Sequence, residues 1–152
     1  MADEHQYCTF YVDGQYFGVD VLQVQEVIRY QEMTRVPLAP PAVRGLINLR
    51  GQIVTAIDLR RRLGLSDRPA EQQPVNVIVH TDDGAISLLV DEIGDVLEVP
   101  GKLFERPPET LRGTARELIR GAYKLNDRLL LILDTERTVR LTGNNRDCER
   151  HD

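Results

Sequence analysis

Side chains that could act as nucleophiles, general bases or metal ligands are few in this sequence of 152 residues, and they do not cluster. Of the three histidines, two lie near the termini, and the two serines, Ser66 and Ser87, lie in no nucleophile-elbow motif. No P-loop, GxGxxG or HExxH motif occurs. His80 stands close to Asp82 and Asp83, but a strand that enters an Asp-Gly turn explains these residues without a metal ion. The sequence therefore predicts no catalytic residue, no metal site and no cofactor.

Charge and composition argue against several classes of partner. The net charge of −5 disfavours a nucleic-acid binder, which needs a basic surface, and the absence of Trp leaves no obvious stacking platform for bases. The two cysteines, Cys8 and Cys148, have no CxxC spacing, so we expect reduced structural thiols. The sequence shows no secretory leader and no apolar run of membrane-spanning length. We therefore expect a cytoplasmic protein that neither binds nucleic acid nor inserts into a membrane.

Two charged runs could attract ligands, but each has a simpler interpretation. The run Arg60-Arg61-Arg62 could bind phosphate, yet near the end of a short helix it complements the helix dipole and keeps the surface soluble. The acidic residues Asp91, Glu92, Asp95 and Glu98 lack the spacing of a calcium loop. We interpret them as the solvated edge of a sheet.

Arg50 is the candidate for recognition of another protein. It forms a predicted tight turn with Gly51, and an internal copy of this segment has Asn126 at the matching position, so the turn itself does not require arginine. A guanidinium group presents five donors and keeps its charge, which suits it to carboxylates or helix-end carbonyls of a partner. The competing interpretation is that Arg50 only decorates the surface.

The element that positions Arg50 is a predicted hairpin of two strands over residues 43–59, which is rich in β-branched residues. The same pattern returns over residues 119–135. Gly45 matches Gly121 and Asp58 matches Asp134, both at a spacing of 76 residues and without a gap. Residues 24–30 before the hairpin are read as a further strand. The repeat predicts two similar lobes of one compact protein.

The remaining segments complete this architecture. Hairpins are predicted over residues 6–19 and 75–90, and short helices follow Asp58 and Asp134, which are cap candidates. We therefore expect an all-β fold in a single domain: lobe one over about residues 6–65, a polar linker over 66–74, lobe two over about 75–141, and a polar tail over 142–152. Each lobe is expected to be a small barrel.

The string VRGLINLRGQIVTAIDL, with FGVDVLQVQEVIRY before it and GAYKLNDRLLLILD in the second copy, resembles the CheW-like chemotaxis coupling proteins. The resemblance covers about residues 10–141. It implies two pseudo-repeated, five-stranded, Src-homology-3-like β-barrels packed together, with short helices. It also implies a non-enzymatic adaptor between chemoreceptor cytoplasmic tips and the regulatory domain of the histidine kinase CheA, recruited to receptor arrays at the membrane.

The resemblance also implies which residues touch the partners. Carried onto the matching positions of this sequence, they are Val24, Glu26, Val27, Gly45, Arg50 and Gly51. From the residues alone, apolar Val24 would rather be placed in the core. Thr55 stands where the family's usual string has proline. Two other functions stay open: a CheW-like scaffold in a non-chemotaxis two-component pathway, and a small ligand-binding or enzymatic barrel.

Overall fold

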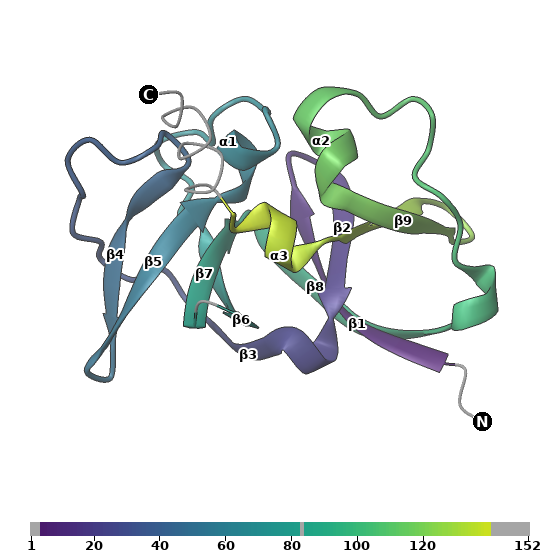
Figure 1. Cartoon of the computed structure of the whole chain (residues 1–152), viewed down its shortest axis with the longest axis horizontal. Helices are drawn as coiled ribbons and strands as arrows, with labels where there is room; N and C mark the ends of the chain where they lie inside the picture. Colours follow the sequence, from purple (N-terminus) through teal and green to yellow (C-terminus); the bar gives the residue numbers. More distant parts are fainter. Residues whose placement is uncertain (1–3, 83, 141–152) are drawn as a thin grey trace.

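The computed structural model describes residues 4–82 and 84–140, which form ten strands in two five-stranded sheets. The first sheet has the order β8-β1-β2-β10-β9, with β1 (Glu4–Val12), β2 (Gln15–Asp20), β8 (Glu92–Pro100), β9 (Ile119–Lys124) and β10 (Leu129–Leu133). The second has the order β3-β6-β7-β5-β4, with β3 (Val24–Ile28), β4 (Val43–Leu49), β5 (Gln52–Asp58), β6 (Val75–Thr81) and β7 (Gly84–Val90). The sheets lie beside each other along the long axis (Figure 1). The predicted all-β class with two five-stranded units is confirmed.

Short helical turns join the strands: η1 (Val21–Gln23), α1 (Leu59–Arg62), η2 (Gly101–Leu103), α2 (Gly113–Leu118) and α3 (Thr135–Thr138). The carboxylates of Asp58 and Asp134 cap α1 and α3 as predicted. They accept hydrogen bonds from the backbone N–H groups of Arg60 at 3.0 Å and Arg137 at 3.1 Å. No helix within residues 4–82 and 84–140 is long and apolar enough to cross a membrane. The predicted polar tail, residues 142–152, lies outside the described residues.

The two sheets are not built from the two consecutive lobes expected from the sequence. The first sheet combines β1 and β2 with β8, β9 and β10, and the second combines β3, β4 and β5 with β6 and β7. Each half of the chain therefore donates its first hairpin to the sheet of the other half. The chain leaves the first sheet through η1, where the Asp20 carboxylate accepts a hydrogen bond from the Leu22 N–H group at 2.9 Å. A boundary at residues 66–74 divides the repeats in sequence but not the sheets in space.

The internal repeat itself is confirmed in three dimensions. Antiparallel hairpins form from β4 with β5 and from β9 with β10, and each hairpin adds to its sheet through a parallel pairing, β5 with β7 and β10 with β2. The backbone N–H of Asp58 donates to the Ala42 carbonyl at 2.8 Å, and the N–H of Asp134 donates to the Leu118 carbonyl at 2.7 Å. The two hairpins thus have the same backbone arrangement, including this hydrogen bond at the equivalent aspartate.

Neither sheet closes into a barrel, contrary to the expectation. In the described ranges, β3 and β4 are opposite edges of the second sheet, β8 and β9 are opposite edges of the first, and no strand pairing joins them. In the second sheet the chain between the two edges contains Pro37, Pro40 and Pro41. Thr34 in this connection forms an isolated bridge with Leu46 of β4. The prolines that follow have no N–H to donate, so they do not extend this bridge into a ladder.

The main hydrophobic core is shared by both sheets. It joins Phe10 and Phe17 of the first sheet to Val77 and Leu88 of the second, all at most 2% exposed. Each sheet also holds a smaller cluster in its own curve, around Tyr123 in the first and around Ile47 in the second. Because the largest apolar cluster spans the junction, the two sheets form one folding unit.

Candidate partner-binding surface

Strand β3 supplies one side of the surface on which the predicted contact residues lie. It is an edge strand that pairs only with β6, and a bulge separates Val24 from Glu26 in the register. Val24 packs against the main core and Ile28 against the small cluster of the second sheet. Val27 points the other way and is 39% exposed. An edge strand with an exposed apolar side chain is accessible to another protein.

The turn between β4 and β5 supplies the other side. Arg50 has φ 52° and Gly51 has φ 88°, so both residues of this two-residue turn are left-handed, as in a type I′ hairpin. The Asn48 side-chain oxygen accepts a hydrogen bond from the Gly51 N–H at 2.8 Å. Glycine adopts this conformation without cost, whereas arginine does so only against a steric penalty. The residue at position 50 is therefore not selected by the turn.

Glu26 and Arg50 meet across the open side of the second sheet. The Arg50 guanidinium donates a hydrogen bond to the Glu26 carboxylate, which joins the two opposite edges of the sheet at one end. The hydrogen bond from Arg50 lowers the pKa of Glu26 from its usual value. The Arg50 side chain is still 67% exposed, against 25% for Glu26. The pair thus fixes the direction of a guanidinium group that keeps donors free for a partner.

Gly45 lies apart from this pair and has a different role. It is buried, and a Cβ atom at this position would lie 2.7 Å from the backbone oxygen of Thr34. Thr34 and Leu46 exchange two backbone hydrogen bonds of 2.8 Å at this close approach. The structure thus places Glu26, Arg50, Gly51 and Val27 at or near the surface. It places Gly45 in the interior and Val24 against the core.

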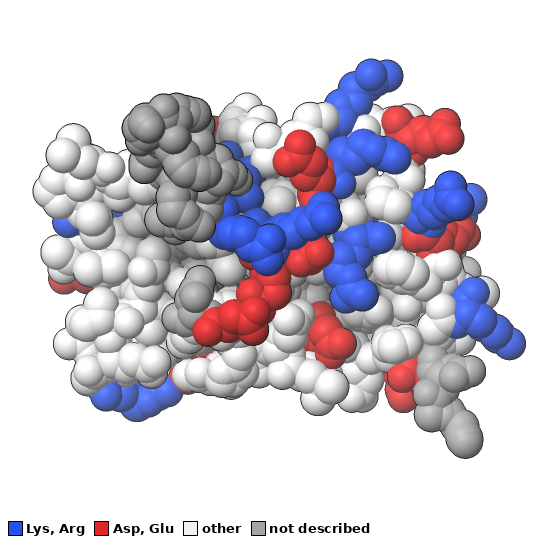
Figure 2. All heavy atoms as spheres, in the orientation of Figure 1, with Lys and Arg blue, Asp and Glu red and all other residues white. Residues whose placement is uncertain are grey.

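Two exposed apolar residues, one in the β4–β5 hairpin and one just before β3 in the chain, were not predicted from the sequence. Ile53, in the same hairpin as Arg50, is 60% exposed, and Leu22, just before β3, is 84% exposed. The period of two in a strand carried the signal for Ile53, because inward-facing Val54 and Ala56 require position 53 to face outward. In the space-filling view the face of the β4–β5 hairpin is largely uncharged, whereas charged side chains gather over the middle of the molecule (Figure 2).

A different set of charged residues, Asp58, Arg60, Arg68 and Asp91, forms a buried network. Arg60 is only 7% exposed and binds the Asp91 carboxylate through two nitrogens, at 2.6 and 3.1 Å. Arg68 binds the same carboxylate at 2.9 Å and Asp58 at 3.3 Å. The interpretation of Asp91 as part of a solvated edge, and of Arg60 as a surface charge, was therefore wrong.

This network is structural. Burial acts to raise the pKa of Asp91, but the hydrogen bonds from Arg60, from the Asp13 N–H and from Arg68 outweigh it, and the pKa lies below its usual value. A carboxylate held ionised by fixed cations is not a poised proton donor. Among residues 4–82 and 84–140, no group of three or more His, Cys, Asp or Glu side chains is arranged to hold a metal ion.

Comparison with known proteins identifies the family of this chain. The CheW-like domain matches residues 6–142 of the chain. The chain belongs to the CheW-like family. It is 34% identical over 125 residues to the chemotaxis protein CheW of Bacillus subtilis, covering 82% of this chain and 80% of that protein. Over 136 residues it is 28% identical to the chemotaxis protein CheW of Treponema pallidum, with 87% and 80% coverage.

The fold agrees with a solved CheW structure. The scaffolding protein TtCheW from Thermoanaerobacter tengcongensis superposes with a TM-score of 0.82 at 26% identity, covering 91% of this chain and 94% of that one. A more distant relative is protein PilI of Pseudomonas aeruginosa, 26% identical over 75% of this chain. The CheW-like chain described here is thus a non-enzymatic scaffold protein of chemotaxis.

Proposed function

We propose that this CheW-like chain couples the cytoplasmic tips of chemoreceptors to the regulatory domain of the histidine kinase CheA. Family membership supports a chemotaxis scaffold, and the surface around Arg50 supports a site for protein contacts. The chain would act in the cytoplasm, where it is recruited to membrane-associated receptor arrays through these contacts.

The observation that carries the proposal is the conformation and support of Arg50. A left-handed arginine is disfavoured by sterics, and such outliers concentrate at functional sites. Glu26 holds the guanidinium group in place from β3, at the opposite edge of the sheet, so the group loses less conformational freedom when a partner binds. Arginine surrounded by apolar area is a common composition of interface hot spots.

We assign the contact to the guanidinium of Arg50 and the apolar side chains beside it, Val27 and Ile53. They provide a charged donor group and exposed apolar area on the same sheet. Gly51 would contribute by letting a partner approach the backbone of the turn. Val24 and Gly45 act indirectly in this proposal, because they position β3 and β4 from within.

The test is a titration of the purified chain against a receptor cytoplasmic-tip fragment and, separately, against the kinase regulatory domain. Reversal of a buried interface charge costs about 2–5 kcal/mol, so we expect Arg50→Glu to weaken at least one affinity by roughly 30-fold or more. Asn126→Glu is the matched control, because position 126 is exposed in the second hairpin. It should leave both affinities within about twofold. If the wild-type chain binds neither fragment, the proposal is wrong.

A further inference from the structure

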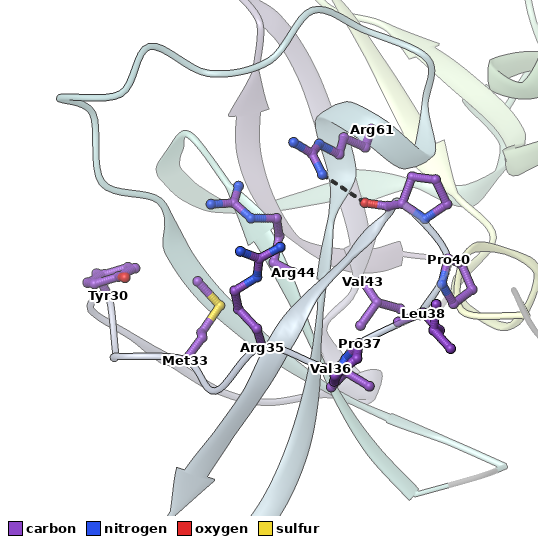
Figure 3. A pocket seen from close by; sticks show the side chains of 12 residues that line it. Tyr30, Met33, Arg35, Val36, Pro37, Leu38, Pro40, Val43, Arg44 and Arg61 are labelled. Carbon is purple, nitrogen blue, oxygen red and sulfur yellow. Dashed lines mark hydrogen bonds between the residues drawn. The ribbon is translucent and has the colours of Figure 1, made fainter.

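The loop between β3 and β4 encloses a pocket at the far end of β4 from Arg50. The pocket has a volume of about 550 Å³, and its lining includes the three arginines Arg35, Arg44 and Arg61. In the close-up view the three guanidinium groups lie on the same side of the pocket, and the proline-containing segment forms the other side (Figure 3). At about 3.3 Å per residue, the six steps from Arg44 to Arg50 span roughly 20 Å. This pocket is therefore separate from the surface around Arg50.

Local carboxylates balance the arginines of the pocket only in part. Arg44 lies 3.0 Å from Asp58, and Arg61 lies 3.0 Å from Asp67. Asp58 is shared with Arg68 at 3.3 Å, so its single charge serves two guanidinium groups. Within the described residues, Arg35 has no ion pair. On a chain of net charge −5, this pocket is a local site of excess positive charge.

Leu38 lines the same pocket, and both its backbone conformation and its exposure to water are unfavourable. It has φ 65° and is fully exposed, so it bears both the steric cost of a left-handed leucine and the cost of an apolar side chain in water. The loop that holds it is well anchored. The Val43 N–H donates to the Pro40 carbonyl at 2.9 Å, and the Arg61 guanidinium donates to the Pro41 carbonyl at 3.0 Å. Leu38 is thus presented by a fixed loop that contains three prolines.

We propose that this pocket is a second docking surface, which takes an acidic segment of a protein partner: a carboxylate enters among Arg35, Arg44 and Arg61 while Leu38 inserts between apolar side chains of the same partner. Planar guanidinium groups match carboxylates in a bidentate geometry, and Arg35 is free to supply one. The exposed Leu38 favours a polypeptide over a small oxyanion, because an inorganic ion gains nothing from an apolar rim. The proposal does not depend on the assignment of Arg50.

The first test uses defined probes and the full-length chain. An amidated Ac-Glu-Leu-Glu-Leu-Glu peptide is titrated while backbone amide shifts are followed by NMR, beside Ac-Gln-Leu-Gln-Leu-Gln and inorganic phosphate. We expect saturable shifts around Arg35, Leu38 and Arg44 with the acidic peptide and none with the glutamine peptide. Equal shifts with phosphate, and no response at Leu38, would replace the proposal by a simple oxyanion site. No carboxylate-dependent shift at the pocket would overturn it.

The second test separates binding from folding by single substitutions. Arg35→Glu should weaken binding of the acidic peptide at least tenfold without lowering Tm, because Arg35 is exposed and has no ion pair among residues 4–82 and 84–140. The matched control is Arg120→Glu, the position equivalent to Arg44 in the second hairpin, which should keep peptide affinity within about twofold.

Leu38→Asn should change stability and peptide affinity in opposite directions. Asparagine tolerates the left-handed conformation, so Tm should stay constant or rise by roughly 2–4 °C while peptide affinity falls. A fall in Tm with unchanged peptide affinity would show that Leu38 serves the fold, and would refute the proposed insertion.

Discussion

The two hairpins of the repeat have the same backbone arrangement but different side chains at each end. Asp58 and Asp134 both cap a short helix, but Asp58 is 1% exposed in an ion-pair network, whereas Asp134 is 30% exposed and lies 3.8 Å from Arg137. At the other end, Arg50 and Gly51 are left-handed, and Asn126 and Asp127 are not. The two copies thus share their backbone arrangement, but the buried ion pairs, the exposed arginine and the exposed apolar Ile53 all belong to the first hairpin.

The largest effect should separate the two caps. Asp58→Ala removes a helix cap and leaves the buried Arg68 without one of its two carboxylate partners. We therefore expect a loss of about 3–5 kcal/mol in the free energy of unfolding. Asp134→Ala removes an exposed cap and should cost about 0.5–2 kcal/mol. Urea denaturation of both variants measures the difference. Equal losses would show that the buried network contributes nothing beyond capping.

The shared backbone arrangement can be tested at its two glycines. A Cβ atom at Gly45 would lie 2.7 Å from the Thr34 oxygen, and one at Gly121 would lie 2.5 Å from the Glu105 oxygen and overlap the Phe104 ring. Because backbone oxygens cannot yield as a flexible side chain does, Gly45→Ala and Gly121→Ala should each cost about 1–3 kcal/mol. Thermal melting checks this. If one of the two is neutral, the hairpins are not equivalent at these positions.

Exchange of the turn residue tests whether the difference at the tip is functional. Arg50→Asn places the residue of the second copy in the first, and asparagine accepts the left-handed conformation. The free energy of unfolding should change by no more than about 0.5 kcal/mol, while affinity for the receptor tip or the kinase regulatory domain falls. Melting and titration are run on the same preparation. A marked drop in Tm with intact binding would make Arg50 a structural residue.

The smallest effect concerns the protonation of Glu26. Arg50 lowers the pKa of Glu26, so the contact is fully present above the usual pKa of a glutamate and is lost as the pH falls through the lowered value. Arg50→Gln should return the pKa of Glu26 upward, toward its usual value. An NMR titration of the Glu26 carboxyl carbon follows this directly. An identical titration curve in the variant would mean that the contact is not formed in solution.

Local features of the fold could be predicted from the sequence, and non-local ones could not. The hairpins and the caps at Asp58 and Asp134 follow from turn residues, β-branched runs and a repeat without gaps. The exchange of hairpins depends on pairings between distant strands: β1 with β8 and β2 with β10 in the first sheet, and β3 with β6 and β5 with β7 in the second. Nothing in the local pattern of any of these strands specifies its distant partner.

The candidate site shows the same limit. Arg50 could be found because its internal counterpart is a different residue, and Glu26 was implied by the family resemblance. Their direct contact required the curl of the second sheet, which brings its two edges together at one end. Asp91 was misjudged because its acidic neighbours suggested solvent, while its actual partners, Arg60 and Arg68, lie more than twenty residues earlier in the chain.

The exchanged hairpins set the order in which the chain can fold as it leaves the ribosome. The second sheet has all its strands once β7 has emerged at Val90, but the first must wait for β10, which ends at Leu133. Until then the β1–β2 hairpin offers the unpaired side of β2, with Phe10 and Phe17 lacking much of their final cover. A nascent or truncated chain that stops before β10 would therefore present an open strand edge to its neighbours, the kind of surface from which misassembly starts.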